Sequence, residues 1–132
     1  MSLIEKLKKL STVKETATLV DSKFFQKKDL VPTKIPVMNL LQSGEIDGGF
    51  GSGVTLWAGP SRHFKTSLML VNMKAYLDKY KDAVVIFYDS EFGSPQSYFT
   101  SFGIPLDRVL HTPITNIEQL KFDLMKQLEG ID

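Results

Sequence analysis

The sequence predicts an α/β fold in which helices flank a parallel sheet. Short, nearly continuous apolar runs, VTLWA at 54–58 and AVVIFYD at 83–89, have the length and composition of strands buried in such a sheet. Longer segments with apolar residues at helical spacing alternate with these runs along the chain. The resulting order of strand, helix, strand, helix, strand and helix is the one that a parallel sheet with crossover helices requires.

Composition limits both the size of the fold and its partners. The 132 residues are 42% hydrophobic and 23% charged, which suits one domain, or part of one, with a single core. Lysine and arginine number 16 and aspartate and glutamate 15, so the formal charge of +1 predicts no overall attraction to nucleic acid or anionic membranes. Cysteine is absent, and no apolar run approaches the roughly 20 residues of a membrane span. We expect a soluble, cytoplasmic protein without a membrane partner.

The amino-terminal segment is expected to form a small helical arm. Leu3, Leu7 and Leu10 lie at helical spacing, with lysines on the other face. A second short helix is predicted in TATLVDSKFF, at 16–25. Such an arm can cap the core of its own chain or dock on a neighbouring subunit, and apolar stripes more often pack within their own chain.

The break VPTKIP marks the boundary between the arm and the core. Pro32 and Pro36 disfavour helix at the residues just before them, so the arm is assigned to 1–33 and the core to 34–132. Five glycines then occur in the ten residues of GEIDGGFGSG. Because an apolar run follows at once, this density indicates a tight turn into a strand.

The core elements then follow in alternation. Strands are expected at 54–58, 83–89 and 107–112, and helices at 66–80, 94–103 and 115–131. Ser94 and Pro95 are expected to be the N-cap and the first residue of the middle helix. The apolar sides of the other two helices are assigned to Leu68, Val71, Ala75 and Leu77, and to Ile117, Leu120, Leu124 and Leu128.

The loop GPSRHFKTS, at 59–67, is close to the phosphate-binding pattern Gly-x-x-x-x-Gly-Lys-Ser/Thr. It leaves a predicted strand and opens a predicted helix, so its backbone N–H groups and the positive end of the helix would converge on an anion. Lys65 would then contact the terminal phosphates of ATP, and the Thr66 hydroxyl would ligate Mg²⁺. The alternative is a strand-to-helix turn that contains Lys-Thr for structural reasons alone.

Phe64 departs from the pattern, because it stands where the second glycine belongs. A positive φ at this position would cost roughly 1–3 kcal/mol, whereas a negative φ would require only a pocket for the ring. Arg62 and His63 either add positive charge beside a phosphate or lie solvated at the tip of the loop. The candidate nucleotide-binding residues in the loop are Gly59, Pro60, Ser61, Arg62, His63, Phe64, Lys65, Thr66 and Ser67.

Acidic residues end the strand in VVIFYDSEFG. Asp89 would support the magnesium as a Walker B element, or Glu91, beyond the carboxyl end of the strand, would orient the water that attacks a γ-phosphate. Polar residues also end many strands without any such role. Because the loop and these acids follow consecutive predicted strands, we expect them at one edge of the sheet.

An ordered series of motifs gives this chain a family resemblance. GPSRHFKTS, VVIFYDSEFG, YFTSFGIPLDRVLHTP and IEQLKFDLMKQL, with TKIP and SGEI upstream, resemble the RecA-type recombinases, phage members included, over nearly the whole chain. The resemblance implies a truncated RecA-like P-loop ATPase core preceded by a small helical arm. It further implies a DNA-dependent ATPase that forms filaments on single-stranded DNA and promotes homologous strand exchange in phage recombination, repair and replication.

The resemblance also implies roles for particular residues. Lys65 matches the phosphate-binding lysine, Thr66 the Mg²⁺ ligand, Glu91 the activator of the attacking water and Tyr98 the adenine-stacking tyrosine. Tyr98 is otherwise an ordinary position of an amphipathic helix. Since a related loop carries Phe-Lys, Phe64 is expected to be tolerated.

Partners and compartment follow from the same resemblance. The arm is expected to pack on an adjacent protomer of a homo-oligomeric filament, and recombination mediators and single-strand-binding proteins are expected partners. The compartment would be the host-cell cytoplasm if a phage encodes the chain.

The family continues into a further strand and DNA-binding loops beyond these 132 residues, so we expect no strand exchange by this chain alone. A non-catalytic nucleotide-binding or filament-docking piece remains an alternative, as does a small P-loop kinase, although no candidate arginine pair for an acceptor site is found.

Overall fold

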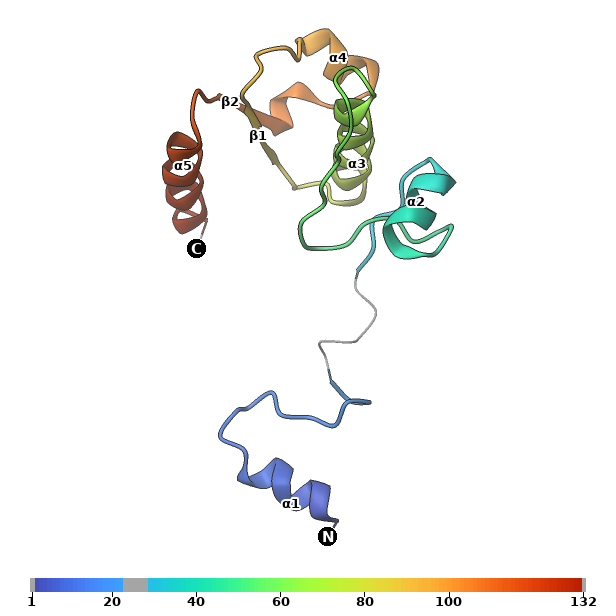
Figure 1. The fold of residues 1–132 in the computed structure, drawn as a ribbon, viewed down its shortest axis with the longest axis vertical. Coiled ribbons are helices and arrows are strands. Elements are labelled where there is room, and N and C mark those ends of the chain that lie inside the picture. Colours follow the sequence, from blue (N-terminus) through green and yellow to red (C-terminus); the bar gives the residue numbers. More distant parts are fainter. Residues whose placement is uncertain (1, 23–28, 132) are drawn as a thin grey trace.

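The computed structural model describes residues 2–22 and 29–131, which form an α/β arrangement (Figure 1). The helices are α1 (Leu3–Leu10), α2 (Pro36–Ser43), α3 (Lys65–Lys79), α4 (Gln96–Ser101) and α5 (Ile117–Glu129), with a 3-10 turn, η2, at Leu106–Arg108. The strands β1 (Val85–Asp89) and β2 (Val109–Pro113) pair in parallel. The predicted fold class is confirmed at the level of an α/β chain with a parallel sheet.

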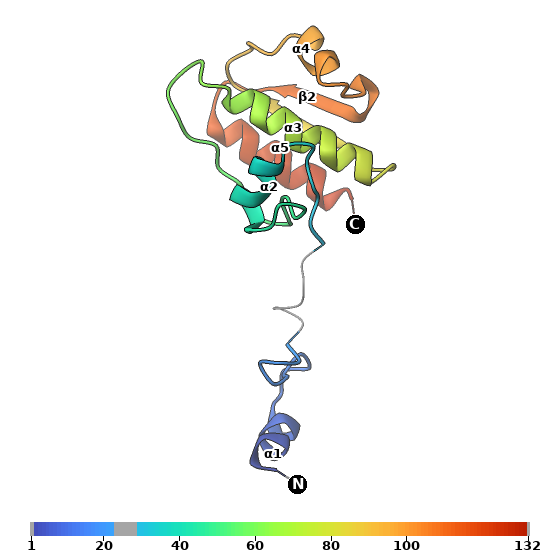
Figure 2. The ribbon, with the colours of Figure 1, turned by 90° about the vertical axis from the view of Figure 1, so that its right-hand side faces the viewer.

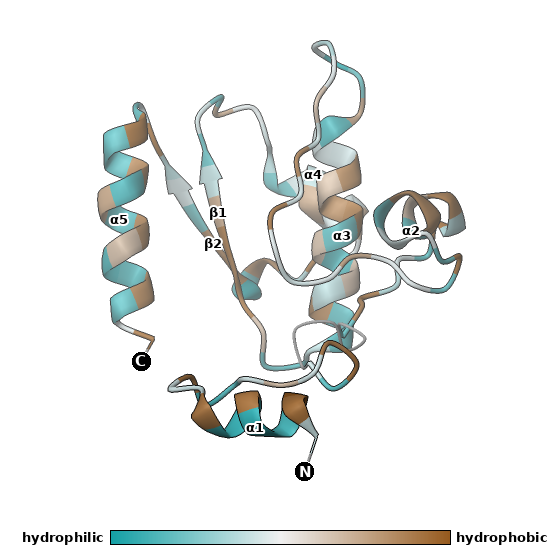
Figure 3. Ribbon diagram, turned by 60° about the horizontal axis from the view of Figure 1, so that its bottom comes forward, coloured by the Kyte–Doolittle hydropathy of each residue, from teal (hydrophilic) through white to brown (hydrophobic). Residues whose placement is uncertain are grey.

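The two-stranded sheet lies between α5 on one side and α3 with α4 on the other (Figures 1 and 3). Alternation along β1 explains this layering, because successive side chains of a strand point to opposite faces. Phe87 packs against the core formed with α3 and α4. Its neighbour Tyr88 instead donates a hydrogen bond from its hydroxyl to Asp123 of α5, at 2.6 Å.

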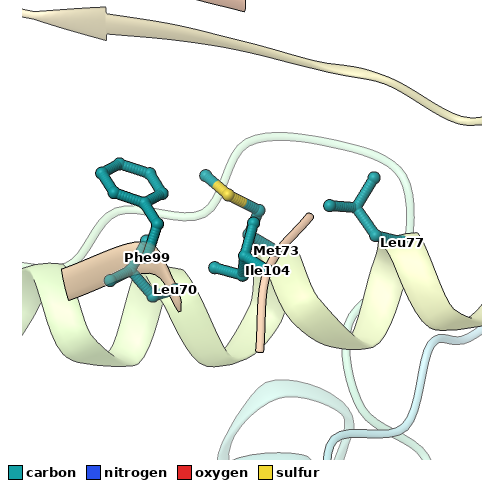
Figure 4. Close-up of a cluster of buried hydrophobic side chains, with 5 residues drawn as sticks. All are labelled: Leu70, Met73, Leu77, Phe99 and Ile104. Carbon is teal, nitrogen blue, oxygen red and sulfur yellow. The ribbon is translucent and has the colours of Figure 1, made fainter. Parts of the chain in front are cut away.

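The core lies between α3, α4 and the sheet (Figure 4). Its buried members are Leu70, Met73, Leu77, Phe99 and Ile104. The three α3 residues are spaced by three and four positions and so share one face of that helix. This face corrects the predicted one, since of Leu68, Val71, Ala75 and Leu77 only Leu77 is buried.

The carboxyl end of α3 is closed by Arg108 of η2. Its guanidinium donates to the carbonyl oxygens of Leu77 (3.0 Å), Tyr80 (2.6 Å) and Ala83 (2.6 Å from Nη2 and 2.8 Å from Nε). The last carbonyls of a helix have no partner within it, so the bond to Leu77 satisfies such a group. The Tyr80 carbonyl also accepts from the Ala83 N–H, at 3.2 Å. Arg108 thereby ties the end of α3 to the beginning of the sheet.

α1 stands apart from the other helices in two views related by a quarter turn (Figures 1 and 2). Ser2 and Glu5 form a capping box at its start. Its apolar side chains remain exposed, with Leu10 at 78%. The predicted helix at 16–25 is wrong for 16–22, where Thr18 and Asp21 instead close an isolated turn by hydrogen bonds. The remainder of that prediction, 23–25, lies outside the described residues.

α2 was not expected from the sequence. Pro36 is its first residue and Gly44 its left-handed C-cap, with φ of 77°. The buried side chain of Asn39 fixes this helix to the preceding segment, because it accepts from the Thr33 backbone N–H at 2.8 Å and donates to the carbonyls of Thr33 and Ile46. The proline-marked break is therefore a non-helical segment that leads directly into a helix.

The strand expected at 54–58 is not formed, which corrects that prediction. Val54 and Leu56 are almost fully exposed, and within the described chain the sheet consists of β1 and β2. A strand exists only through hydrogen bonds to a neighbour, and this run has none in the ladder. The helix at 94–103 also begins later than expected: α4 starts at Gln96 with Pro95 as its N-cap, and Ser94 makes no capping bond.

α5 carries its predicted apolar positions but buries none of them. Leu120 and Leu124 are half-buried, while Ile117 and Leu128 are more than half exposed. Asp123 anchors the helix to β1, and Gln127 adds a side-chain bond to the same carboxylate at 2.5 Å. Within the described residues, no helix is both long and apolar enough to cross a bilayer.

Candidate functional site

A pocket of about 920 Å³ lies where the 59–67 loop, the first turn of α3, the end of β1 and α4 meet. Side chains from distant parts of the sequence converge there. Its lining includes the predicted residues Ser61, Arg62, His63, Phe64, Lys65, Thr66, Ser67, Asp89, Glu91 and Tyr98. The position agrees with the rule that ligands of open α/β folds bind at the carboxyl ends of the strands.

Gly59 and Pro60 do not line the pocket but form the base of the loop. The Lys65 ammonium donates to the Pro60 carbonyl oxygen at 2.8 Å, which draws the two ends of the loop together. Residues 61–64 project between them, and the ring Nδ1 of His63 bonds to the Ser61 carbonyl at 2.9 Å. The ammonium group of Lys65 is thus held at the base of the loop, while Lys65 itself lines the pocket.

The backbone of the loop adopts left-handed conformations at two non-glycine residues. Arg62 has φ of 65° and Phe64 has φ of 57°. The Phe64 ring is 75% exposed, so it neither packs in a core nor fills the pocket. Of the two possibilities for Phe64, the structure therefore has the positive φ, which is costly for a side chain with a Cβ atom.

The amino end of α3 lies at the pocket, and its first turn has backbone N–H groups without partners inside the helix. Phe64 is the N-cap, and its side chain makes no capping hydrogen bond to the first turn. The first bond that closes the helix is from the Leu68 N–H to the Phe64 carbonyl, at 3.0 Å. The N–H groups of residues 65–67 therefore lack helical partners and, with the helix dipole, favour an anion.

Asp89 and Glu91 differ in environment although they are two residues apart. Asp89 is 6% exposed, and its carboxylate oxygen Oδ1 accepts from the backbone N–H groups of Glu91 and Phe92. Glu91 is exposed at the pocket. Any part that Asp89 plays for a metal ion is accordingly indirect, whereas the Glu91 carboxylate is available to a ligand or its water.

Tyr98 closes the pocket from α4. Its hydroxyl and that of Ser67 hydrogen-bond to each other, which joins α4 to the first turn of α3. The ring also packs edge-on against Phe102, with centroids 5.5 Å apart. Tyr98 therefore has a structural function in this fold, and its ring still forms part of the pocket wall.

The sequence interpretation did not single out several polar wall residues. Ser90, Gly93 and Ser94 line the pocket, as does Tyr88. Burial and the hydrogen bond to Asp123 raise the pKa of Tyr88 to about 12. The signal that finds the first three is their position, since they directly follow the carboxyl end of a predicted strand.

Metal-ligand clusters give no further candidate. In residues 2–22 and 29–131, no group of three or more histidines, cysteines, aspartates or glutamates is placed to hold an ion. Thr66 is exposed at the start of α3, beside Lys65. A hydroxyl there can contribute one ligand to a magnesium ion that a nucleotide brings with its phosphates.

Comparison with known proteins identifies a relative from a phage. No family model matches the chain. A curated protein of Enterobacteria phage T4, "Recombination and repair protein", is 49% identical over 130 residues, covering 98% of this chain and 33% of the phage protein. The chain therefore spans about a third of the length of the relative that it matches.

Proposed function

We propose that this chain binds ATP with Mg²⁺ in the pocket beside the 59–67 loop, as the nucleotide-binding part of a RecA-type recombinase that acts in phage recombination and repair. The observation that carries the proposal is the convergence of Lys65, Glu91 and Tyr98 on one pocket at the amino end of α3. The 49% identity to a phage recombination and repair protein supports the same assignment.

Each pocket residue has a part in the proposed binding mode. The free N–H groups of 65–67 and the Lys65 ammonium hold the phosphates, and the Thr66 hydroxyl ligates Mg²⁺. Tyr98 stacks on the adenine. Glu91 orients the water that attacks the γ-phosphate, a role that its exposed position at the pocket permits.

The activity of the whole assembly belongs to the same proposal. Hydrolysis stimulated by DNA, filament formation on single-stranded DNA and strand exchange are proposed for the full recombinase, because this chain spans 33% of the related phage protein. Recombination mediators and single-strand-binding proteins are its proposed partners.

The arm is proposed to dock on a second copy of the chain. Leu3, Ile4, Leu7 and Leu10 form an apolar stripe on α1 that the described residues leave more than half exposed. Transfer of such a stripe from water into a groove of another protomer is favourable, at about 25 cal/mol per Å² of apolar surface. A Leu7→Asp substitution should reduce self-association in analytical ultracentrifugation, whereas Lys8→Gln should not.

Binding of a fluorescent ATP analogue in the presence of Mg²⁺ tests the nucleotide site. Saturable binding is expected for the unmodified chain, and Lys65→Ala should weaken it by at least roughly tenfold, because a charge-assisted hydrogen bond to phosphate is lost. Lys121→Ala, which removes an exposed lysine of α5 away from the pocket, is the matched control. Equal affinities for the Lys65→Ala and Lys121→Ala chains would contradict the assignment.

A further inference from the structure

The turn after β1 is held by one buried carboxylate. Asp89 ends the strand, and its Oδ1 accepts from the N–H of Glu91 at 3.0 Å and from the N–H of Phe92 at 2.9 Å. Phe92 has φ of 53°, a left-handed conformation that residues other than glycine seldom adopt. These two bonds fix the backbone of Glu91 relative to the end of the strand, at the edge of the sheet that faces the 59–67 loop.

The second oxygen of the carboxylate faces a histidine on the neighbouring strand. Nε2 of His111 lies 3.5 Å from Oδ2 of Asp89. The parallel register sets Phe87 opposite His111, and their rings stack with centroids 5.7 Å apart and an interplanar angle of 24°. A backbone bond from the Ile114 N–H to the Asp89 carbonyl, at 3.0 Å, adds a further tie to the segment after β2.

Oδ1 of Asp89 thus accepts two hydrogen bonds and Oδ2 lies near His111, while the side chain of Glu91 stays exposed at the pocket. A buried carboxylate is stable only when such donors satisfy it, so its contacts are specific. The Asp89 side chain is 7% exposed and that of His111 is 50% exposed. The buried carboxylate therefore contacts a histidine of β2 that is half exposed to solvent.

From this arrangement we infer that Asp89, supported by His111, is a positioning residue that holds Glu91 toward the terminal phosphate of the bound nucleotide. The inference rests on the proposed function, since it takes the pocket ligand to be ATP. It assigns Asp89 a role other than metal support. A backbone held by two hydrogen bonds limits the directions that the Glu91 side chain can take, and such preorganisation is what a water-orienting carboxylate requires.

Nuclear magnetic resonance on the full chain tests the inference in two ways. Amide hydrogen exchange at Glu91 and Phe92 reports the turn itself, and the carboxyl ¹³C resonance of Glu91 reports its response to Mg²⁺ and a slowly hydrolysed ATP analogue. In Asp89→Ala, exchange at both amides should rise roughly tenfold, because each loses its acceptor. The Glu91 carboxyl response should fall to less than about half of its value in the unmodified chain.

Three further variants separate positioning from general loss of structure. Asp89→Asn keeps an oxygen that can accept both amide bonds and should retain most of the protection. His111→Phe supplies a phenyl ring that can stack on Phe87 but has no Nε2. Its exchange rates at Glu91 and Phe92 should lie between those of the unmodified chain and those of Asp89→Ala. Asp82→Ala removes an exposed aspartate just before β1 and should change neither reading. The β1 amide resonances establish that each variant is folded.

Failure of the inference is distinguishable from failure of the proposed function. Unchanged exchange at Glu91 and Phe92 in Asp89→Ala would overturn the inference, whatever the nucleotide does. Nucleotide binding that depends on Lys65 but leaves the Glu91 carboxyl resonance unmoved would also overturn it and leave the proposed function standing. Absence of any nucleotide binding by the unmodified chain would contradict the proposed function, and with it the orientation toward a phosphate.

Discussion

Lys65 and Pro60 are joined by a hydrogen bond of 2.8 Å from the lysine ammonium to the proline carbonyl oxygen. The bond closes the loop on itself and ties the ammonium group to the base of the loop. A phosphate oxygen can take this donor only by replacing the carbonyl or by sharing the ammonium with it, since lysine has three N–H donors. A nucleotide that replaces this internal bond therefore binds less tightly than its contacts with Lys65 alone would allow.

Phe64→Gly is expected to stabilise the chain. Its φ of 57° costs an L-residue about 1–2 kcal/mol, and glycine gives back roughly 0.5–1 kcal/mol through its greater freedom in the unfolded chain. Because the ring is 75% exposed, little burial is lost. The free energy of unfolding from urea titration should rise by about 0.5–1 kcal/mol. Phe64→Ala keeps Cβ and should gain much less, and an equal gain in both variants would refute the strain explanation.

Alkaline pH is expected to weaken the contact between β1 and α5. Burial, and then the hydrogen bond to Asp123, raise the pKa of Tyr88 from about 10 to about 12, so the folded state favours the protonated hydroxyl. The corresponding stability is fully present below about pH 10 and is lost as the pH rises through about 12. Unfolding free energies measured across this range should fall more steeply for the unmodified chain than for Tyr88→Phe. Parallel curves would contradict the assigned shift.

Arg108→Ala is expected to be strongly destabilising although the residue lies outside the pocket. Its guanidinium satisfies the carbonyls of Leu77, Tyr80 and Ala83 at the end of α3. Loss of these charge-assisted bonds should lower the free energy of unfolding by about 2–3 kcal/mol. Arg108→Lys should restore only part of this, because lysine lacks the planar fork. Thermal unfolding of both variants tests this prediction. A decrease of less than about 0.5 kcal/mol in the free energy of unfolding of Arg108→Ala would contradict the role of Arg108 at the end of α3.

The sequence was informative where local periodicity and tertiary packing agree. α3, α5 and both strands lie within or close to their predicted ranges. The helix α2 was missed because Pro36 was interpreted as part of a break and Gly44 as part of a tight turn into a strand. A proline at the first position and a left-handed glycine after the last are also the signature of a short helix.

Non-local features could not be predicted in the same way. The run at 54–58 has the composition of a strand, but composition does not provide the neighbour that a strand needs. For the site, the motif spacing singled out Lys65 and Glu91, and both line the pocket. Their roles toward a nucleotide stay predictions. The left-handed φ of Phe64 and the bonds from Asp89 to the turn depend on the backbone path, which a motif does not specify.

Mapping the nucleotide by backbone amide chemical shifts tests the central claim most directly. On addition of Mg²⁺ and ATP, the largest shifts should occur in 59–67, at Glu91 and at Tyr98, and in Lys65→Ala they should require at least roughly tenfold more nucleotide. A second, largely apolar pocket between α3 and Pro32–Ile35, which includes Val71 and Phe102, provides an internal comparison. Shifts concentrated there, or loop shifts with the same dependence on nucleotide concentration in Lys65→Ala as in the unmodified chain, would contradict the account.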